Sequence, residues 1–374
     1  MRFYIISPVI HKKSLSGYAG YAPYVREMNL WLKHVDEVRV LAPVANKDVD
    51  NLEIVYQHTN LIFDEVPPLA FINLRSALRS FILLPYIIVK MISGMVWADH
   101  IHLRCPSNMG LIGSVIQLFF PGKSKSVKYA NNWDPKSKQF FSYRIQQMIL
   151  RSRITRNARV LVYGDWNEKS NNIKPFYTAT YSDKMKTDVL VRDINYNSTI
   201  WLLFVGTITP NKCPDLVLRS FNCLLEAGFD VNINFLGDGV LLEDLKKYTQ
   251  ENNLNSRVFF RGKVSQEDAV HYFKMSHFLV FPSKSEGWPK VVAEAMWWGC
   301  LPVTTDVSCV NYMVGDGSRG ILVEPDEKVI CETLSDLIFS PERYNEMCYN
   351  AIEWSRKFSL EKFEKDISLL LYPN

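Results

Sequence analysis

The chain has 374 residues and a formal net charge of +4, and 47% of its residues are apolar and 22% charged. This length favours two domains, and this composition excludes collagen-like, low-complexity and intrinsically disordered proteins. The seven cysteines form no C-x-x-C pair and no cluster with histidine. We therefore expect neither a zinc site nor a disulfide framework, and free thiols in a reducing compartment.

The first residues lead directly into an apolar run. Met1 and Arg2 precede F-Y-I-I, which is typical of a buried first strand and lacks the longer apolar core and small-residue cleavage site of a signal peptide. We therefore expect a cytoplasmic protein.

Short apolar runs alternate with longer amphipathic stretches along the whole chain, as strands and crossover helices do in a parallel sheet. The strands predicted in the first half are residues 3–7, 38–42, 52–56, 100–103, 126–129 and 160–163. Those predicted in the second half are residues 201–205, 232–236, 258–260, 278–281, 301–304 and 320–323. The pattern predicts two doubly wound α/β domains, with a boundary in the polar stretch 181–198.

One stretch is unusually apolar. Residues 81–97 contain Pro85 and Lys90 and reach only the lower limit of a bilayer span. We expect a buried helix here, with a helix on a membrane surface as the alternative.

Charge is distributed unevenly between the two halves. Residues 1–190 carry 25 Lys and Arg against 14 Asp and Glu, a net charge of +11, whereas the remainder carries −7. Between Lys123 and Arg159 ten basic side chains accompany one acid, Asp134. Such an excess favours an anionic partner, namely a membrane surface, a phosphate-bearing substrate or a nucleic acid. A solvated helix face explains it equally well.

The segment 281–296 carries the most chemical information. It reads F-P-S-K-S-E-G-W-P-K-V-V-A-E-A-M, which predicts a strand end, a loop, and a helix that starts at Pro289 and ends before Gly299. The free N–H groups of such a helix face the carboxyl edge of a parallel sheet, where ligands bind. Two carboxylates, Glu286 and Glu294, frame the turn and suit the hydroxyl groups of a sugar nucleotide. One solvated glutamate and one on a helix surface are the alternative.

Three strands of the second half end on glycine: Gly206 in F-V-G-T-I-T-P-N-K, Gly237 in F-L-G-D-G, and Gly262 in F-R-G-K. Glycine at three such ends indicates close approach of the backbone to one ligand. Lys212, which follows the first of them, would supply a positive charge to a phosphate.

Together these motifs resemble the retaining glycosyltransferases of family 4, which have the GT-B fold: two facing Rossmann-like α/β domains with parallel sheets and a deep cleft between them. Over residues 201–326 the motifs F-V-G…K, F-L-G-x-G, F-x-G and P-S-x-x-E-G-x-P-x-x-x-x-E-A-M-x-x-G occur in the family's order. Over residues 1–190 the resemblance depends on the strand pattern and a few local features. It implies an acceptor-binding domain over residues 1–185, a nucleotide-sugar-binding domain over 186–357, and a C-terminal helix over 358–374 that crosses back to the first domain.

The resemblance also implies a role for each motif residue. Glu286 would contact the donor sugar's hydroxyls, Glu294 the ribose hydroxyls, and Lys212 the diphosphate, so Glu286 and Lys212 are candidate catalytic residues. The other donor-binding candidates are Gly206, Thr207, Gly237, Gly262, Lys263, Gly287, Trp288, Pro289 and Lys290, the last four through backbone groups that cap the phosphate or sugar.

Two positions depart from the family's pattern. Thr207 stands where relatives usually have arginine, and Cys213 where they have glycine. The missing arginine is one of two cations expected to stabilise the leaving diphosphate, so another residue must replace it or turnover is slow. The alternative function is therefore a catalytically impaired nucleotide-sugar-binding subunit. A sugar-nucleotide epimerase or a phosphorylase of the same fold fits less well.

In the first half, S-G-Y-A-G-Y at residues 16–21 follows the first strand and resembles the family's glycine-rich loop. That loop lies against the donor phosphates and the acceptor. Its candidate residues here are Gly17, Tyr18 and Gly20.

Two further strand ends of the first half carry candidates. Arg104 stands where relatives often have a second histidine, and we expect it to point into the cleft as a third catalytic residue; a surface arginine is the alternative. Asn131 and Asn132, with Trp133, follow the fifth strand and suit a platform for the acceptor sugar. A plain turn explains them equally well.

The resemblance implies transfer with retention of configuration and without a metal ion, in which the departing phosphate oxygen takes the acceptor's proton. No DxD cluster stands out, and we expect no cofactor, because the nucleotide sugar is a co-substrate. The expected acceptor is a saccharide or a lipid-linked sugar of polysaccharide or glycolipid biosynthesis, met at the inner face of the cytoplasmic membrane through the basic first domain. No recognition module accompanies the basic run, so we expect no nucleic-acid partner.

Overall fold

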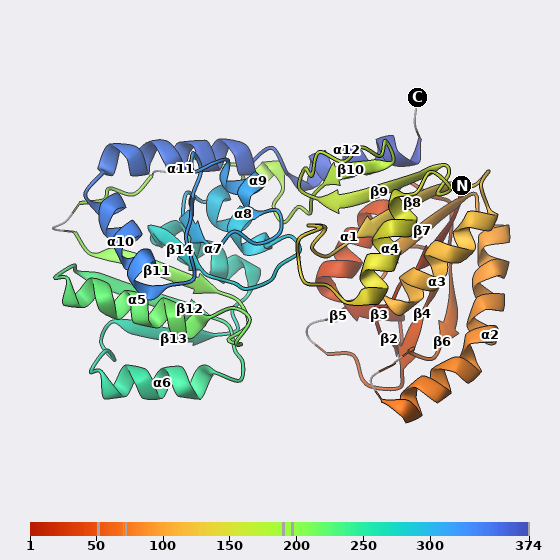
Figure 1. The fold of residues 1–374 in the computed structure, drawn as a ribbon, viewed down its shortest axis with the longest axis horizontal. Coiled ribbons are helices and arrows are strands. Elements are labelled where there is room, and N and C mark those ends of the chain that lie inside the picture. Colours follow the sequence, from red (N-terminus) through yellow and green to blue (C-terminus); the bar gives the residue numbers. More distant parts are fainter. Residues whose placement is uncertain (51–52, 70, 72, 189–190, 196–197, 373–374) are drawn as a thin grey trace. The chain divides into compact units, whose positions relative to one another are not determined.

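The chain divides into two units, each built around its own sheet (Figure 1). The computed structural model describes all residues except 51–52, 70, 72, 189–190, 196–197 and 373–374. Unit 1 comprises residues 1–177 and 362–374, and unit 2 comprises residues 178–361. The chain therefore passes from one unit to the other after Tyr177 and returns after Glu361.

Unit 2 contains a six-stranded parallel sheet in the order β13-β12-β11-β14-β15-β16. Its strands are β11 (Ile200–Val205), β12 (Val231–Leu236), β13 (Val258–Gly262), β14 (Phe278–Phe281), β15 (Leu301–Thr304) and β16 (Ile321–Leu322). The inner strands are largely apolar because helices cover both faces of a parallel sheet, although β12 also contains Asn232 and Asn234. Every residue of β14 and β15, for example, is buried.

The helices of unit 2 follow these strands in turn. They are α5 (Pro214–Glu226), α6 (Leu242–Glu251), α7 (Gln266–Met275), α8 (Lys290–Trp297), α9 (Val310–Val314), α10 (Glu327–Ile338) and α11 (Pro341–Ser355), with a 3₁₀ turn at Asp183–Met185. The strand order is that of the Rossmann fold, and it reverses between β11 and β14. The loops after these two strands therefore flank the position where open α/β sheets bind ligands.

Unit 1 repeats this order. Its parallel strands run β6-β4-β1-β7-β8-β9-β10, and a hairpin and one further strand extend the sheet beyond β4. The strands are β1 (Arg2–Ile6), β2 (His11–Ser14), β3 (Gly17–Tyr21), β4 (Glu37–Ala45), β5 (Glu53–Val55), β6 (Leu61–Val66), β7 (His100–Cys105), β8 (Ser124–Tyr129), β9 (Ala158–Tyr163) and β10 (Ile173–Phe176). Residue 52, the predicted start of the third strand, lies outside the described residues.

Alternate side chains of β1 face two helical layers. Phe3 stacks on Trp31 with ring centroids 6.0 Å apart, whereas the ring of Tyr4 lies so close to Gly94 that a Cβ there would fall 2.0 Å from it. The helices of unit 1 are α1 (Ala22–Leu32), α2 (Leu74–Trp97), α3 (Asn108–Ile116), α4 (Phe141–Arg151) and α12 (Leu360–Leu371), with a 3₁₀ turn at Gln117–Phe119. Trp31 belongs to α1 and Gly94 to α2, so these two helices cover opposite faces of the sheet.

The glycine-rich loop expected at residues 16–21 is instead part of a β-hairpin. β2 and β3 pair in antiparallel register, with Ser14 opposite Gly17. Gly17 has a φ of +130°, which the turn between them requires and which favours glycine. The hairpin escaped prediction because H-K-K-S is short and polar and therefore lacks the apolar pattern of a strand.

The helix over the apolar run is longer than predicted and only partly buried. α2 continues through Pro85 and begins at a capping box formed by Asn73 and Ser76. Among the helices that the structure describes, α2 is the one whose length and composition would allow it to cross a membrane, and 28% of its most apolar 18-residue stretch is buried. The expectation of a buried helix is thus wrong for one side of α2.

Two side chains of the basic run, Lys125 and Lys128, lie inside unit 1. Lys125 and Lys128 are 1% and 0% exposed, and their Nζ atoms donate to the carbonyl oxygens of Arg156 (2.7 Å) and Tyr177 (2.6 Å). Burial lowers the pKa of Lys125 to about 8. Lys128 also lies 5.6 Å from the ring centroid of Phe363 in α12. These two lysines hold the unit together and do not contribute to a basic surface.

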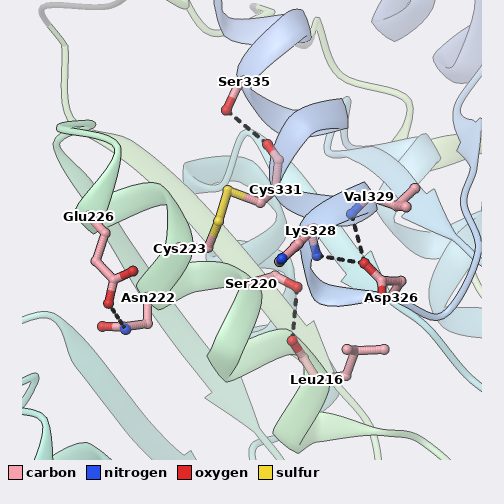
Figure 2. Close-up of a disulfide and its surroundings, with 10 residues drawn as sticks. All are labelled: Leu216, Ser220, Asn222, Cys223, Glu226, Asp326, Lys328, Val329, Cys331 and Ser335. Carbon is pink, nitrogen blue, oxygen red and sulfur yellow. Dashed lines mark hydrogen bonds between the residues drawn. A yellow bond between two sulfur atoms is a disulfide. The ribbon is translucent and has the colours of Figure 1, made fainter.

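One disulfide joins two helices of unit 2 (Figure 2). Cys223 of α5 is bonded to Cys331 of α10, 108 residues further along the chain. The expectation that all thiols are free is therefore wrong for this pair, and its wide separation gave no spacing signal. The other five cysteines are buried and unpaired within the described part of the chain.

Candidate functional site

Two loops meet at the point where the sheet of unit 2 reverses its strand order. One follows β11 (residues 206–213) and the other follows β14 (residues 282–289). The backbone carbonyl oxygen of Asn211 accepts from the backbone N–H of Lys284 at 2.8 Å. The side-chain amide of Asn211 donates to the backbone carbonyl of Ser285 at 3.1 Å. These bonds fix the two loops against each other before any ligand arrives.

Lys212 and Glu286 form an ion pair across these loops. Nζ of Lys212 contacts Oε1 of Glu286, and the two side chains are 19% and 11% exposed. The hydroxyl of Ser283, a buried residue, donates to the same carboxylate oxygen at 2.5 Å. The ammonium also lies 4.9 Å from the ring centroid of Phe281, the last residue of β14. The structure thus brings together a cation and a carboxylate at the ligand-binding edge of the sheet.

The glycines at the strand ends have a structural reason of their own. A Cβ on Gly237 would lie 1.9 Å from the carbonyl oxygen of Gly206, and one on Gly239 would lie 2.4 Å from that of Ile208. The loops after β11 and β12 therefore contact each other through their backbones. Gly262 differs, since a Cβ added there would meet nothing within 4 Å and its φ is +69°. Close packing against the neighbouring loop is therefore a second reason, besides approach to a ligand, for a glycine at position 237.

Glu294 lies in the second turn of α8 and has a different partner from Glu286. Its Oε1 accepts from the hydroxyl of Thr180 at 2.9 Å. Burial raises the pKa of this carboxyl, although the Thr180 hydrogen bond and the nearby charge of Lys290 oppose the effect. The site therefore contains two separate carboxylates that can accept hydrogen bonds, Glu286 in the loop before α8 and Glu294 within α8.

The start of α8 presents backbone N–H groups toward the same edge. Pro289 is the N-cap residue, and no side chain of the described residues caps this end. The carbonyl of Gly287 accepts from Ser308 at 2.7 Å and from the thiol of Cys309 at 3.3 Å, which fixes the orientation of this peptide. Such an end attracts anions, since the helix dipole and the N–H groups both favour negative charge.

The remaining predicted donor residues divide between packing and exposure. The indole of Trp288 is buried against Trp354, with ring centroids 6.5 Å apart, so only its backbone is available to a ligand. Thr207 and Lys263 are exposed. Cys213 has a φ of +49°, in the left-handed region that favours glycine, which is the residue that the resemblance implies here.

The residues that hold this site in place had no role predicted from the sequence. Ser283 and Asn211 orient the Lys212–Glu286 pair, and Thr180 holds Glu294. Ser283 belongs to the P-S-x-x-E motif, so the motif contained a signal for it. The other two act through contacts between distant segments, which leave no local pattern.

The candidates of unit 1 are largely engaged within that unit. The guanidinium of Arg104, at the end of β7, pairs with Glu27 at 2.9 Å and lies 5.3 Å from the ring centroid of Tyr24. Its side chain is 16% exposed. The hydroxyl of Tyr18 donates to Glu65 at 2.6 Å. A Cβ on Gly20 would meet the ring of His11 at 2.9 Å.

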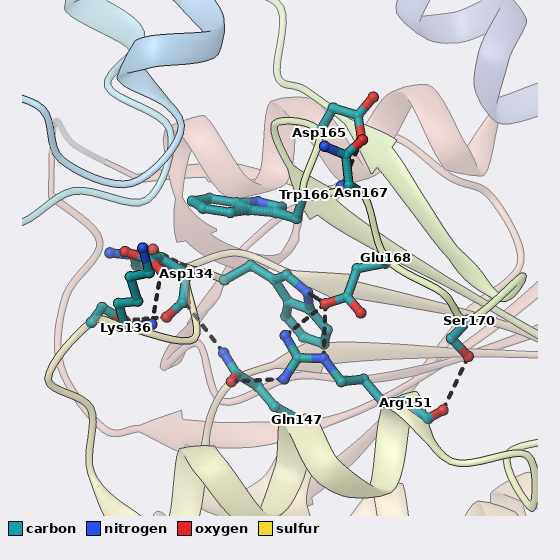
Figure 3. Close-up of polar contacts among 12 residues, drawn as sticks. Asp134, Lys136, Gln147, Arg151, Asp165, Trp166, Asn167, Glu168 and Ser170 are labelled. Carbon is teal, nitrogen blue, oxygen red and sulfur yellow. Dashed lines mark hydrogen bonds and ion pairs between the residues drawn. The ribbon is translucent and has the colours of Figure 1, made fainter.

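The indole in the segment after β8 is buried and offers no platform to a sugar, whereas the acceptor role of Asn131 and Asn132 stays a prediction. Trp133 is 0% exposed, and its Nε1 donates to Glu168 at 2.7 Å. Arg151 lies over the indole at 4.4 Å and pairs with the same carboxylate, as Figure 3 shows for Arg151 and Glu168. Asn131 and Asn132 accept bonds from the backbone N–H groups of Asn132 and Asp134, respectively. The predicted indole platform is wrong because Arg151 and Glu168 cover the ring.

Within the described residues, no three His, Cys, Asp or Glu side chains converge as a metal-ion site.

Residues 193–354 match the family of glycosyl transferases group 1. This segment is similar to a glycosyl transferases group 1 domain. It contains Lys212, Glu286 and Glu294, and with them both loops of the switch point.

Two curated proteins show the same similarity. An uncharacterised glycosyltransferase of Methanocaldococcus jannaschii is 29% identical over 197 residues, covering 52% of this chain and 53% of the relative. A Campylobacter jejuni protein named N-acetylgalactosamine-N,N'-diacetylbacillosaminyl-diphospho-undecaprenol 4-alpha-N-acetylgalactosaminyltransferase is 30% identical over 129 residues, 34% of each chain. The chain thus spans about half the length or less of the curated relatives it matches.

Solved structures extend the similarity to the whole fold. HepE of Anabaena, solved in complex with UDP and glucose, has a TM-score of 0.67, with 13% sequence identity and 99% coverage of both chains. Together with the Rossmann strand order of both sheets, this confirms the predicted fold class, the α/β GT-B type with two Rossmann-like domains.

Proposed function

We propose that the protein is a glycosyltransferase that moves a sugar from a nucleotide-sugar donor to a saccharide or lipid-linked acceptor. The observation that carries this proposal is the Lys212–Glu286 pair, which joins the two switch-point loops of the group 1 domain. The similar HepE structure, which has UDP and glucose bound, supports a nucleotide-sugar donor. The Campylobacter relative, which is named for a diphospho-undecaprenol acceptor, supports a lipid-linked one.

The chemistry of the site suits the two ends of such a donor. The Lys212 ammonium and the N–H groups at the start of α8 favour the diphosphate, whose negative charge grows as the sugar departs. The Glu286 carboxylate accepts hydrogen bonds from sugar hydroxyls, and its pairing with Lys212 offsets its repulsion of the phosphates. Glu294, held by Thr180, accepts from the ribose hydroxyls.

We further propose that transfer retains the configuration at the anomeric carbon. The bond from this carbon to the diphosphate oxygen breaks, and the acceptor oxygen bonds to the same face. The acceptor's proton passes to the departing phosphate oxygen, so no side chain forms a covalent bond to the sugar. Glu286 therefore orients the sugar. The guanidinium of Arg104 is paired with Glu27 within unit 1. The catalytic role of Arg104 therefore stays a prediction.

The proposed setting is the inner face of the cytoplasmic membrane, in the synthesis of a surface polysaccharide or glycolipid. An acceptor carried on a lipid diphosphate is confined to that surface. The net charge of +11 over residues 1–190 favours an anionic membrane.

The first test is a thermal-shift panel of UDP-, GDP-, ADP- and TDP-sugars, because a ligand that binds only the folded state raises the melting temperature. We expect one nucleotide to stabilise the wild-type protein. Lys212→Met should abolish most of this shift, whereas Lys247→Met, at an exposed lysine of α6, should leave it intact.

Turnover separates an enzyme from a binding subunit. With the preferred donor and a lipid-linked acceptor, Glu286→Gln should lower kcat by about 10²–10³-fold, the usual cost of removing one transition-state hydrogen-bonding group. Glu251→Gln, on the surface of α6, is the matched control. Donor binding without any turnover by the wild-type protein would favour the impaired subunit that Thr207 suggests, and no nucleotide binding at all would refute the proposal.

A further inference from the structure

One side of α2 is apolar and uncovered in unit 1. The side chains most exposed on it are Leu74, Leu78, Phe81, Ile82, Val89 and Val96, each at least 61% exposed, and we call these six residues the α2 stripe. At 100° per residue they fall within an arc of about 100°, so they form one continuous band along the helix. A run of this length on one face exceeds the scattered apolar side chains of an ordinary surface.

The opposite side of α2 is held firmly in the core of unit 1. Ile87, Met91 and Met95 are 0% exposed, and Gly94 admits the ring of Tyr4 against the helix backbone. Placing α2 across a bilayer would remove these side chains from their contacts with the sheet. The helix can therefore meet a membrane only with its stripe, lying along the surface.

The charges on and around the stripe are basic. α2 carries Arg75, Arg79 and Lys90 and no acidic residue. Arg75 and Arg79 are exposed, whereas Lys90 lies 3.6 Å from Asp64 of β6. Over residues 66–164 the chain has 14 Lys and Arg against two acids, Asp99 and Asp134. The side chains next to the stripe thus suit an anionic surface and repel a basic one.

We propose that the α2 stripe is a docking surface for an anionic lipid bilayer. The helix lies parallel to the membrane plane, its apolar side chains enter the boundary between headgroups and acyl chains, and Arg75 and Arg79 contact the headgroups. This differs from a purely electrostatic contact through residues 123–159, because Lys125 and Lys128 of that run are buried. Salt should therefore weaken the contact without abolishing it.

A second copy of this chain is the competing occupant. A two-fold dimer would place the same face of both copies together. Arg75 and Arg79 would then face those of the other copy if the helices were parallel, or the C-terminal half of its α2 if they were antiparallel, and α2 has no acid in either half to pair with them. The charges therefore favour lipid over self-association.

The experiment is co-sedimentation of the full-length protein with vesicles of phosphatidylcholine alone or mixed equally with phosphatidylglycerol. It needs neither donor nor turnover, so its outcome is independent of the proposed transferase activity. We expect binding to the mixed vesicles at 0.1 M NaCl. The double variant Ile82→Glu/Val89→Glu should lower the partition coefficient at least about tenfold, because it places two anions in the apolar band. Leu369→Glu, at an exposed position of α12, is the matched control and should bind normally.

The basic residues have a separate readout. Arg75→Gln/Arg79→Gln should weaken binding to the mixed vesicles about 30-fold at low salt, since each basic residue near an anionic surface contributes about a fivefold factor. At 0.5 M NaCl this difference should shrink, while the apolar contact of the wild-type protein persists.

Three results would overturn the proposal: no vesicle binding by the wild-type protein at 0.1 M NaCl, unchanged binding by Ile82→Glu/Val89→Glu, or a wild-type dimer that this variant converts to a monomer in sedimentation velocity. Should that variant fail to fold, Val89→Cys with an environment-sensitive fluorophore replaces it. Its emission should shift to the blue on mixed vesicles, whereas the same label at Leu369→Cys should not shift. An unshifted label at position 89 would equally refute the proposal.

Discussion

Two buried histidines of unit 1 should make the protein sensitive to mild acid. His100 and His102 lie on β7 and are 1% and 0% exposed. Nε2 of His100 and Nδ1 of His102 both lie 2.8 Å from the hydroxyl oxygen of Ser126. That hydroxyl has one proton, so it donates to one ring and accepts from the other. Protonating both rings would leave two donors facing it and its own proton without an acceptor.

Burial lowers the pKa of each of these histidines to about 3. Nearby cations act in the same direction: Arg159 and Lys125 on His100, and Arg104 on His102. Between pH 6.5 and 3 the unfolded chain binds protons that the folded chain does not, so the free energy of unfolding falls as the pH falls. From pH 7 to pH 5 the loss is about 2 kcal/mol for each histidine and about 4 kcal/mol for both.

The assay is urea unfolding at pH 7 and at pH 5. His102→Gln should lose about 2 kcal/mol less than the wild-type protein between the two pH values, whatever its stability at pH 7. His11 is also buried, but it is present in every variant and cancels in the comparison. His271→Gln, at an exposed position of α7, is the control and should not change the pH dependence. If His102→Gln kept the pH dependence of the wild-type protein, the reasoning would be refuted, because the pKa of His102 would then be the same in the folded and the unfolded chain.

Three further changes test unit 2. Gly237→Ala should lower the free energy of unfolding by about 3 kcal/mol or more in urea, because its Cβ would fall 1.9 Å from the carbonyl oxygen of Gly206 at a φ of +137°; wild-type stability would mean that the two loops separate easily. Since burial raises the pKa of Glu294, Glu294→Gln should raise the melting temperature at pH 7.5, and this gain should shrink as the pH falls toward 4. A gain that grows in acid would contradict it. Reductant should lower the melting temperature of the wild-type protein, with a loss of up to about 5 kcal/mol of unfolding free energy for a loop of this length, but should not affect Cys223→Ser/Cys331→Ser. Equal sensitivity of both proteins would argue against the disulfide.

The strands that the sequence revealed are those covered on both faces. β11, β14 and β15 are short, largely apolar runs, and burial on two sides makes such runs stand out. The strands it missed carry weaker signals: β2 is polar, β6 has acids at its centre, and β10 contains Pro175. A very short strand such as β2, or one at the margin of a sheet such as β6 and β10, need not be apolar, so no pattern marks it.

The candidate site was predictable where a motif carried it. Lys212 and Glu286 follow two strands that the apolar pattern had located, and the Rossmann order brings their loops together. The roles of Asn211 and Thr180 depend on contacts between segments 74 and 114 residues apart, so local sequence did not reveal them. The Trp133 platform failed for the same reason, since Arg151 and Glu168 reach the indole from other segments.

The position of α12 bears on how the protein is made. Phe363 of this helix contacts Phe176 and Tyr177, and Asp366 accepts from the Tyr177 hydroxyl at 2.8 Å, so the last residues of the chain complete the first unit. On the ribosome, the side of unit 1 that contains Phe176 and Tyr177 stays uncovered until all of unit 2 has been translated. Unit 2, whose segment is continuous in the chain, can fold first. A nascent chain that stalls before α12 is translated would leave Phe176 exposed to chaperones.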